Sequence, residues 1–327
     1  VVDGRAWRDG GMVDTDVTAA DLRADTGAPD TIYWVYLLRP SREAMTELAQ
    51  RFDLPPTTVE DALAPFERPK VTNHGRVLFF TVLTATWAPE HDPQTTSRLG
   101  SQRLSGVVTP RILITIRLDD TLSTAMFLER WTENAELLTE GTGALLHGVL
   151  DAIVDQQFET IQSLDEVVDD VEAELFEGDP SRREFVQRIF WLRKDLVVLR
   201  RVVLPMREVV TAVVRRRART GSDLDHWYDD LYDHVLRAAD WGDSLRDVVG
   251  SLYETNLSLQ DNRLNDIMKK LAAWGGIIAV PTAITGWFGQ NVPYAGFGHT
   301  WGVWASAISI LAISGGLYAA FRARDWL

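Results

Sequence analysis

A long uncharged stretch near the C-terminal end constrains this chain most. Leu271 to Gly289 (LAAWGGIIAVPTAITGWFG) contains no Asp, Glu, Lys or Arg, and its residues are apolar or small. At about 1.5 Å per residue, a helix of this length comes close to the roughly 30 Å of a bilayer's hydrocarbon core. It ends in Gly289-Gln290-Asn291, where backbone and amide groups close an apolar helix. We therefore expect the chain to cross a membrane here.

A second uncharged stretch, Trp301 to Phe321, predicts a partner helix in the same membrane. Tryptophans near its ends match interfacial aromatic placement. Positive charges lie at the outer ends of the two stretches, at Lys269, Lys270, Arg322 and Arg324. The loop between them, residues 291–300, contains no Lys or Arg. The positive-inside rule therefore predicts a multi-pass protein of the cell membrane with both termini in the cytoplasm.

The rest of the chain has the composition of a globular protein, with 24% charged and 46% hydrophobic residues. Its net charge of −14 argues against a nucleic-acid partner and suits a protein that attracts cations. Cysteine is absent, which excludes disulfides and thiolate metal sites. No phosphate-binding glycine loop, nucleophile elbow or zinc-spaced histidine pair is present, so we do not expect an enzyme. The first residue is Val1 rather than Met, so we expect some N-terminal sequence to be missing.

Residues 1–140 predict an α+β cytoplasmic domain. Residues 1–30 are polar and are expected to form a partly ordered lead-in, followed by a strand at Thr31–Leu38. Ser41 is the predicted N-cap of a helix that ends near Arg51. Thr57 and Glu60 match a capping box for a short helix. The expected elements after Ser41 are helix Val59–Ala64 and strands Val77–Thr86, Leu104–Val108 and Ile112–Arg117, the last two as a hairpin.

Residues 141–221 predict an antiparallel helical hairpin. An acidic helix, Leu145–Glu177, and a basic helix, Arg183–Arg219, are separated by Gly178-Asp179-Pro180. We expect the arginines, including the run Arg215-Arg216-Arg217, to pair with the acidic neighbour. Binding of acidic lipid or nucleic acid to this basic run stays open as an alternative.

Residues 222–270 predict one long stalk helix. Apolar or small residues recur at alternating steps of four and three, which is typical of a packing seam: Leu231, Val235, Ala238, Gly242, Leu245, Val249, Leu252, Asn256 and Leu259. Proline is absent from Ser222 to Val280, so the helix can continue into the membrane segment 271–290 and span roughly 90 Å.

A second stripe on the same stretch is acidic. It consists of Asp233, Asp240, Asp247, Glu254 and Asp261, each seven residues from the next. Its continuation by threes and fours passes through Asn265, Met268, Ala272, Gly275 and Ala279. The stripe is either a solvated face or, if several copies surround an axis, the lining of a pore. Two membrane helices cannot enclose a conduit alone, so a pore requires an oligomer.

Several motifs resemble the CorA-type divalent-cation channels, whose signature at this place is Gly-Met-Asn. The match includes Gly289-Gln290-Asn291, Tyr228–His234 (YDDLYDH), Asn265–Lys269 (NDIMK), Pro281–Gly286 (PTAITG) and the ending Arg322–Leu327. The resemblance implies a funnel-shaped homopentamer in the bilayer, with five first membrane helices around the pore. It implies uptake of hydrated Mg²⁺, with Co²⁺ or Ni²⁺ as further cations, and a short basic tail, 322–327, on the cytoplasmic side.

The resemblance also implies roles for individual residues. Gly289, Gln290 and Asn291 would form the selectivity ring. Asn265, Met268, Leu271, Gly275 and Ala279 would line the pore, with Leu271 at a hydrophobic constriction. A regulatory cation would bind Asp230 of the stalk with a partner after the strand that ends near Thr86, where Glu90 or Asp92 stands in place of a matching aspartate. Glu254 is a further stalk carboxylate of the predicted metal set.

Two departures from the family pattern keep other functions open. Gln290 replaces Met, and the outer loop lacks the usual acidic residue, leaving His299 as its titratable group. Protonation of His299 in each subunit would repel cations. A transporter of Zn²⁺ or an exporter with the same fold stays open, as does a membrane-anchored metal sensor that does not conduct. His226 and His234 are candidates for a peripheral metal site or for a structural role.

Overall fold

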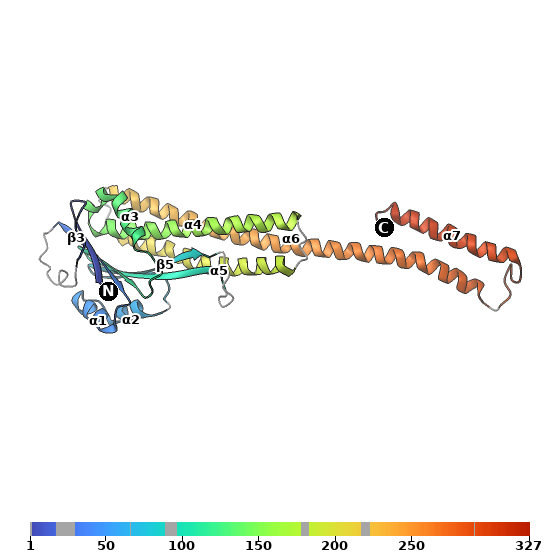
Figure 1. Cartoon of the computed structure of the whole chain (residues 1–327), viewed down its shortest axis with the longest axis horizontal. Coiled ribbons are helices and arrows are strands. Elements are labelled where there is room, and N and C mark those ends of the chain that lie inside the picture. The colour runs from blue at the N-terminus through green and yellow to red at the C-terminus, as the bar shows by residue number, and fades with distance from the viewer. Residues whose placement is uncertain are drawn as a thin grey trace. The chain divides into compact units, whose positions relative to one another are not determined.

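The computed structural model describes residues 2–17, 30–65, 67–88, 97–177, 183–216, 223–290 and 292–327. It divides into two compact units, Val1–Ser251 and Leu252–Leu327, and the division falls within one helix. Figure 1 follows the elements from the blue N-terminal strands to the red C-terminal helix. The break at Gly178-Asp179-Pro180 and the site residues Glu90 and Asn291 lie outside the described residues, and the seven-part division expected from the sequence stays a prediction.

The described strands of the first unit form one sheet in the order β2-β1-β3-β7-β6-β5-β4. Their bounds are β1 Val2–Arg8, β2 Gly11–Asp14, β3 Thr31–Leu38, β4 Lys70–His74, β5 Val77–Trp87, β6 Leu99–Val108 and β7 Ile112–Arg117. Among these strands only β3 and β7 pair in parallel. The predicted strand Thr31–Leu38 and the predicted hairpin of the last two strands are confirmed, but β6 begins at Leu99 rather than at the predicted Leu104.

The prediction of a partly ordered lead-in is wrong for residues 2–14. They form the hairpin β1–β2, and β1 pairs along its whole length with β3. Ala6 and Trp7 are buried there, and the ring of Trp7 contacts that of Trp131 at a centroid distance of 5.4 Å. Pairing with a distant strand therefore overrides the weak local propensity of a Gly- and Asp-rich segment.

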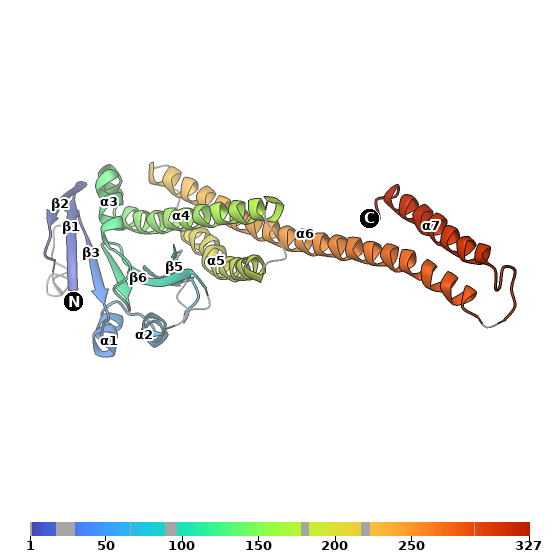
Figure 2. The same ribbon diagram turned by 45° about the vertical axis from the view of Figure 1, so that its right-hand side comes forward.

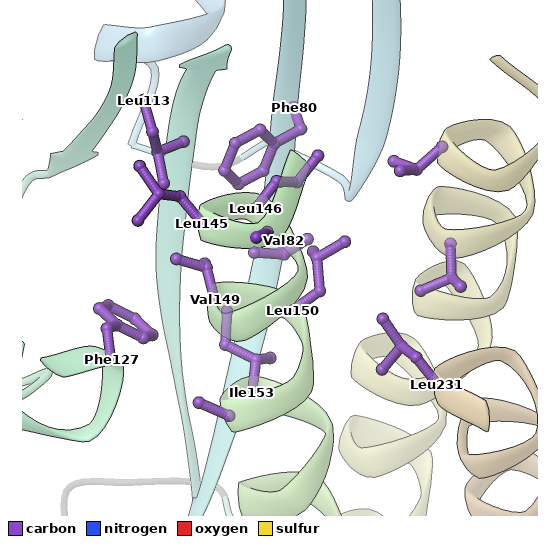
Figure 3. Close-up of a cluster of buried hydrophobic side chains, with 14 of the residues drawn as sticks. Phe80, Val82, Leu113, Phe127, Leu145, Leu146, Val149, Leu150, Ile153 and Leu231 are labelled. Atoms are coloured by element: carbon purple, nitrogen blue, oxygen red, sulfur yellow. The ribbon is translucent and has the colours of Figure 1, made fainter. Parts of the chain in front are cut away.

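Helices cover both faces of the sheet (Figure 2). On one face α1, Arg42–Arg51, and α2, Pro56–Leu63, pack on residues such as Phe79 and Ile114. On the other face, the helices α3 to α6 pack on residues such as Phe80. Because successive strand residues point to opposite faces, neighbours in β5 serve the two cores. Figure 3 shows the larger core, where Leu113 of β7, Leu145 of α4 and Leu231 of α6 contribute to one apolar cluster.

One of the two predicted helix caps is correct. Ser41 accepts a hydrogen bond from Ala44 N–H at 3.2 Å and caps α1. The capping box at Thr57 and Glu60 is wrong, because α2 begins at Pro56, before Thr57, and has no side-chain cap. Proline at the first helical position is already set to a helical φ and lacks the N–H that a cap would satisfy.

The helical part of the first unit starts with α3, Ala125–Glu133, and the 3₁₀ turn η1, Ala135–Glu140. Two long helices follow, α4 over Thr142–Glu177 and α5 over Arg183–Arg216. Arg188 of α5 pairs with Glu174 of α4 at 2.5 Å, as expected for oppositely charged neighbours. Arg216, however, donates to Asn73 Oδ1, Gly75 O and Val77 O at the β4–β5 turn, so for this residue the expected pairing with the acidic helix is wrong.

The longest helix, α6, runs from Asp223 to Phe288, and α7 covers Thr300–Arg322. The predicted seam of α6 is buried, apart from Gly242 and Leu259, which are half-buried. Every residue of the acidic stripe is exposed. The chain thus consists of an α+β domain followed by a long helix and a second apolar helix, which is the predicted fold class.

Candidate functional site

The C-terminal end of α6 presents Gly289 and Gln290. The Gly289 N–H donates to Thr285 O at 2.8 Å, so the last helical hydrogen bond forms beyond Phe288. A Cβ at Gly289 would lie 2.9 Å from Thr285 O, which explains why the chain has glycine there. Gln290 is exposed, and its side-chain amide forms no hydrogen bond to the described residues. Both amide atoms are therefore available to a ligand.

Tyr294 stabilises this helix end and is a residue that sequence reasoning missed. Its hydroxyl donates to Phe288 O at 2.7 Å, which satisfies one of the carbonyls that a helix C-terminus leaves unpaired. Its ring contacts Phe288 and Phe297 at centroid distances of 5.2 and 5.4 Å. A tyrosine six residues after a helix end is a weak sequence signal, because many turns could place its hydroxyl elsewhere.

The two threonines in the apolar part of α6 are hydrogen-bonded within the helix. Thr282 Oγ1 donates to Ile278 O at 3.1 Å, and Thr285 Oγ1 donates to Pro281 O at 2.7 Å. Such bonds matter in a bilayer, where an unsatisfied polar group costs several kcal/mol. The two threonines are therefore compatible with a membrane location.

The residues predicted to line a pore are all exposed in the single chain. They are Asn265, Met268, Leu271, Gly275 and Ala279. Leu271 is 66% exposed and Met268 is 56% exposed. Ile267, Trp274 and Ile278 lie three, four or seven residues from Leu271, hence on its side of the helix, and are exposed as well. This part of the helix is apolar and without cover in one chain, which is expected if some of its residues face lipid and others face further copies.

Two of the predicted regulatory carboxylates, Asp230 and Glu254, lie at different positions along α6. Asp230 is exposed, and its Oδ2 lies 3.6 Å from Nε2 of His234, one turn further along α6. Glu254 is exposed. Asp230 is thus available to a further ligand from outside the chain.

The structure also gathers a cluster that sequence reasoning missed. One ligand atom each of Asp151, Asp155 and His234 lies within 4.8 Å of the others. Arg130 of α3 pairs with both carboxylates, with its Nε 3.0 Å from Asp151 Oδ2. The spacing of four residues between the aspartates on α4 was a usable signal, but their approach to α3 and α6 depends on tertiary packing.

Arg130 already offsets part of the negative charge of the two carboxylates in this cluster. Burial raises the pKa of Asp151 to about 6, and the nearby Arg130 opposes that rise only in part. Nδ1 of His234 is buried and has no hydrogen-bond partner among the described residues. A cation bound by the two carboxylates would have to displace the guanidinium of Arg130.

Comparisons with known proteins match nearly the whole chain. The model of the family described as CorA-like Mg²⁺ transporter protein matches residues 29–323. A cobalt/magnesium transport protein CorA of Thermotoga maritima is 26% identical over 321 residues, covering 96% of this chain and 88% of its own. The CorA of Methanocaldococcus jannaschii is 26% identical over 304 residues, or 90% of this chain and 92% of its own.

The solved structures give the same fold. The complete structure of the CorA magnesium transporter from Methanocaldococcus jannaschii superposes with a TM-score of 0.75 at 21% identity. The superposition covers 100% of this chain and 99% of that one. The likeness therefore extends from the sheet to the last apolar helix.

Proposed function

Since the chain belongs to the family of CorA-like Mg²⁺ transporter proteins, we propose that it moves hydrated Mg²⁺ across a cell membrane, with Co²⁺ as a second cargo. The observation that carries this proposal is the continuity of α6. One helix contains the exposed carboxylates Asp233 to Asp261, the uncharged segment 271–288 and, at its end, the free amide of Gln290. Carboxylates attract the cation, and a neutral helix end recognises it.

Membrane insertion involves both C-terminal helices. Within the described residues, α6 and α7 are long and apolar enough to cross a bilayer. The flanking Lys269, Lys270, Arg322 and Arg324 favour a cytoplasmic location for both termini. Gln290 and the loop that follows it would then face the outside.

A homopentamer supplies the pore that one chain cannot form. Copies of α6 would surround the axis with Asn265, Met268, Leu271, Gly275 and Ala279 toward the centre. The small residues Gly275, Ala279 and Ala283, four apart, let helix backbones approach closely. The exposure of this face in the single chain is what such an assembly requires.

The proposed selectivity ring consists of Gly289, Gln290 and Asn291. Mg²⁺ releases its waters reluctantly, so a ring that recognises the hydrated ion needs neutral hydrogen-bonding oxygens rather than a charged cage. The side-chain amides and the Gly289 carbonyl supply such oxygens. Gln290 adds an acceptor where the family signature has a thioether, which would change the order of preference among hydrated Mg²⁺, Co²⁺ and Ni²⁺.

Regulation is proposed through cation binding to Asp230, which is exposed and lies near His234. Glu90 and Glu254 are the further carboxylates of this proposal. Binding of internal Mg²⁺ to these groups across subunits would close the pore. Transport of Zn²⁺, export, and a sensor that does not conduct are the competing functions.

Flux into sealed liposomes tests the proposal. Mg²⁺, Co²⁺, Ni²⁺ and Zn²⁺ are offered separately, and we expect Mg²⁺ to enter fastest. Asn291→Ala should abolish the flux, and Gln290→Met should change the order of preference. Gln187→Met, on the exposed surface of α5, is the matched control and should behave as the wild type. Flux no higher than in protein-free liposomes would leave only the sensor function.

A further inference from the structure

A basic pocket lies on the first unit, outside the proposed pore. It has a volume of about 670 Å³ and is lined by Asn73, Arg207, Glu208, Thr211, Ala212, Arg215, Arg216 and Tyr232. The pocket's lining contains three guanidinium groups and one carboxylate, although the net charge of the whole protein is −14. Its volume falls within the range of small-molecule sites, about 300–1,000 Å³.

Arg207 and Arg215 form no ion pair with the described residues and are exposed. Together with Thr211 they recur every four residues on α5, so the three side chains share one face. The helix dipole accounts for cations in the last turn, which contains Arg215 and Arg216. It does not account for Arg207, which lies more than two turns before the end of α5. A bound anion would explain why Arg207, Arg215 and Arg216 all line this pocket.

The wall of the pocket opposite α5 is the β4–β5 turn, which hydrogen bonds from Arg216 hold in place. Arg216 donates to Asn73 Oδ1 at 2.7 Å and to the carbonyls of Gly75 and Val77, so it holds the β4–β5 turn against α5. Because the carbonyl of Asn73 is engaged, its amide nitrogen is directed elsewhere, and it has no partner among the described residues. Arg216 is thus a positioning residue, and Asn73 provides a donor next to the free arginines.

The pocket's chemistry selects a class of ligand. Guanidinium groups bind phosphate oxygens in a fork geometry. One phosphate group carries about −1.5 to −2 charges, which is less than the three guanidinium groups can balance. Glu208 disfavours a bare anion, but a carboxylate together with substrate phosphates is a usual way to hold Mg²⁺. The half-buried ring of Tyr232 offers an apolar surface for a base.

We propose that this basic pocket binds the magnesium complex of a nucleoside triphosphate. Arg207 and Arg215 bind the phosphates, Glu208 binds the Mg²⁺ ion that accompanies them, and Tyr232 contacts the base. The proposal does not depend on the transport function, since binding can occur whether or not the chain conducts.

Calorimetric titration of the full-length protein in detergent tests this site. The probes are ATP with Mg²⁺, inorganic tripolyphosphate with Mg²⁺, and sulfate at matched ionic strength. We expect saturable binding of Mg²⁺–ATP and none of sulfate. Arg207→Ala and Arg215→Ala should each weaken ATP binding by about 10-fold or more, because each removes charge-assisted hydrogen bonds. Arg201→Ala, an exposed arginine of α5 outside the pocket, should bind as the wild type.

Two further variants test the parts of the ligand. Glu208→Gln should weaken Mg²⁺–ATP but not ATP in the presence of chelator, and Tyr232→Leu should weaken ATP but not tripolyphosphate. Circular dichroism of the two arginine variants should match the wild type, since neither side chain has an ion pair or hydrogen bond to lose among the described residues. Absence of saturable binding, or equal affinities in the wild type and both arginine variants, would overturn the site. Equal affinities for ATP and tripolyphosphate would overturn the nucleoside assignment.

Discussion

The buried carboxyl group of Asp151 should make folding stability depend on pH in a way that one substitution removes. Burial raises its pKa to about 6 in the folded chain, whereas an unfolded aspartate has a pKa of about 3.9. The folded state therefore binds this proton more tightly. Its stabilising contribution is complete below about pH 4 and is lost as the pH rises through about 6.

The magnitude follows from the difference between the two pKa values. Two pKa units at about 1.4 kcal/mol each amount to about 3 kcal/mol between pH 3.5 and 7.5. We expect the free energy of unfolding of the wild type, relative to Asp151→Asn, to fall by about this amount over that range. Asparagine suits the comparison because its carbonyl can still accept a hydrogen bond from Arg130, which lies 3.0 Å from Asp151.

Urea unfolding of the whole chain in detergent, followed by tryptophan fluorescence, measures this difference. Trp131 is a suitable reporter because it is buried in the adjoining core, against Trp7 and Trp34. Asp169→Asn removes an exposed carboxyl group from the same helix and should reproduce the wild-type pH dependence. The comparison is repeated with His234→Gln introduced into both the wild type and Asp151→Asn, which removes the neighbouring imidazole from both proteins. Parallel curves for the wild type and Asp151→Asn would refute the reasoning.

Three other outcomes follow from packing and charge. Gly106→Ala should destabilise the fold by about 1–3 kcal/mol, because its Cβ would lie 2.4 Å from the Phe80 ring; an unchanged urea midpoint would contradict this. Thr115→Val should cost about 1–3 kcal/mol, because buried Trp34 Nε1 loses its acceptor at 3.0 Å, and Thr115→Ser should restore most of it. His299→Ala should remove any loss of Mg²⁺ uptake between about pH 8 and pH 5.5, and identical profiles would exclude the outer histidine as a charge sensor.

Local sequence patterns were sufficient for much of the chain. The uncharged stretches predicted the apolar parts of α6 and α7, because a membrane-length apolar helix can be recognised from the length and hydropathy of a single segment. The seam of α6 followed from a period that any helix would place on one face, and its burial agrees. Strands β3 and β7 were similarly predictable from dense runs of β-branched and other apolar residues, whereas the first half of β6, from Leu99, lacks such a run and was missed.

Sequence reasoning failed where an element depends on a distant partner. Residues 2–14 carry little strand propensity, and β1 forms because β3 offers it a complete edge. The start of α2 was misplaced because Pro56 needs no side-chain cap, although Thr57 and Glu60 match one. In both places the local signal was weaker than the tertiary or steric constraint that decided the outcome.

The sequence by itself determined the two apolar helices, the acidic stripe and the Gly289-Gln290-Asn291 ending, since each is a contiguous or periodic pattern along one segment. Only the tertiary structure brought Arg130 and His234 to Asp151 and Asp155, and Asn73 to Arg216 of α5. Those groups lie on different elements, and their approach depends on how the helices pack over the sheet. A periodic pattern specifies a face, but a site built from several elements requires the fold that joins them.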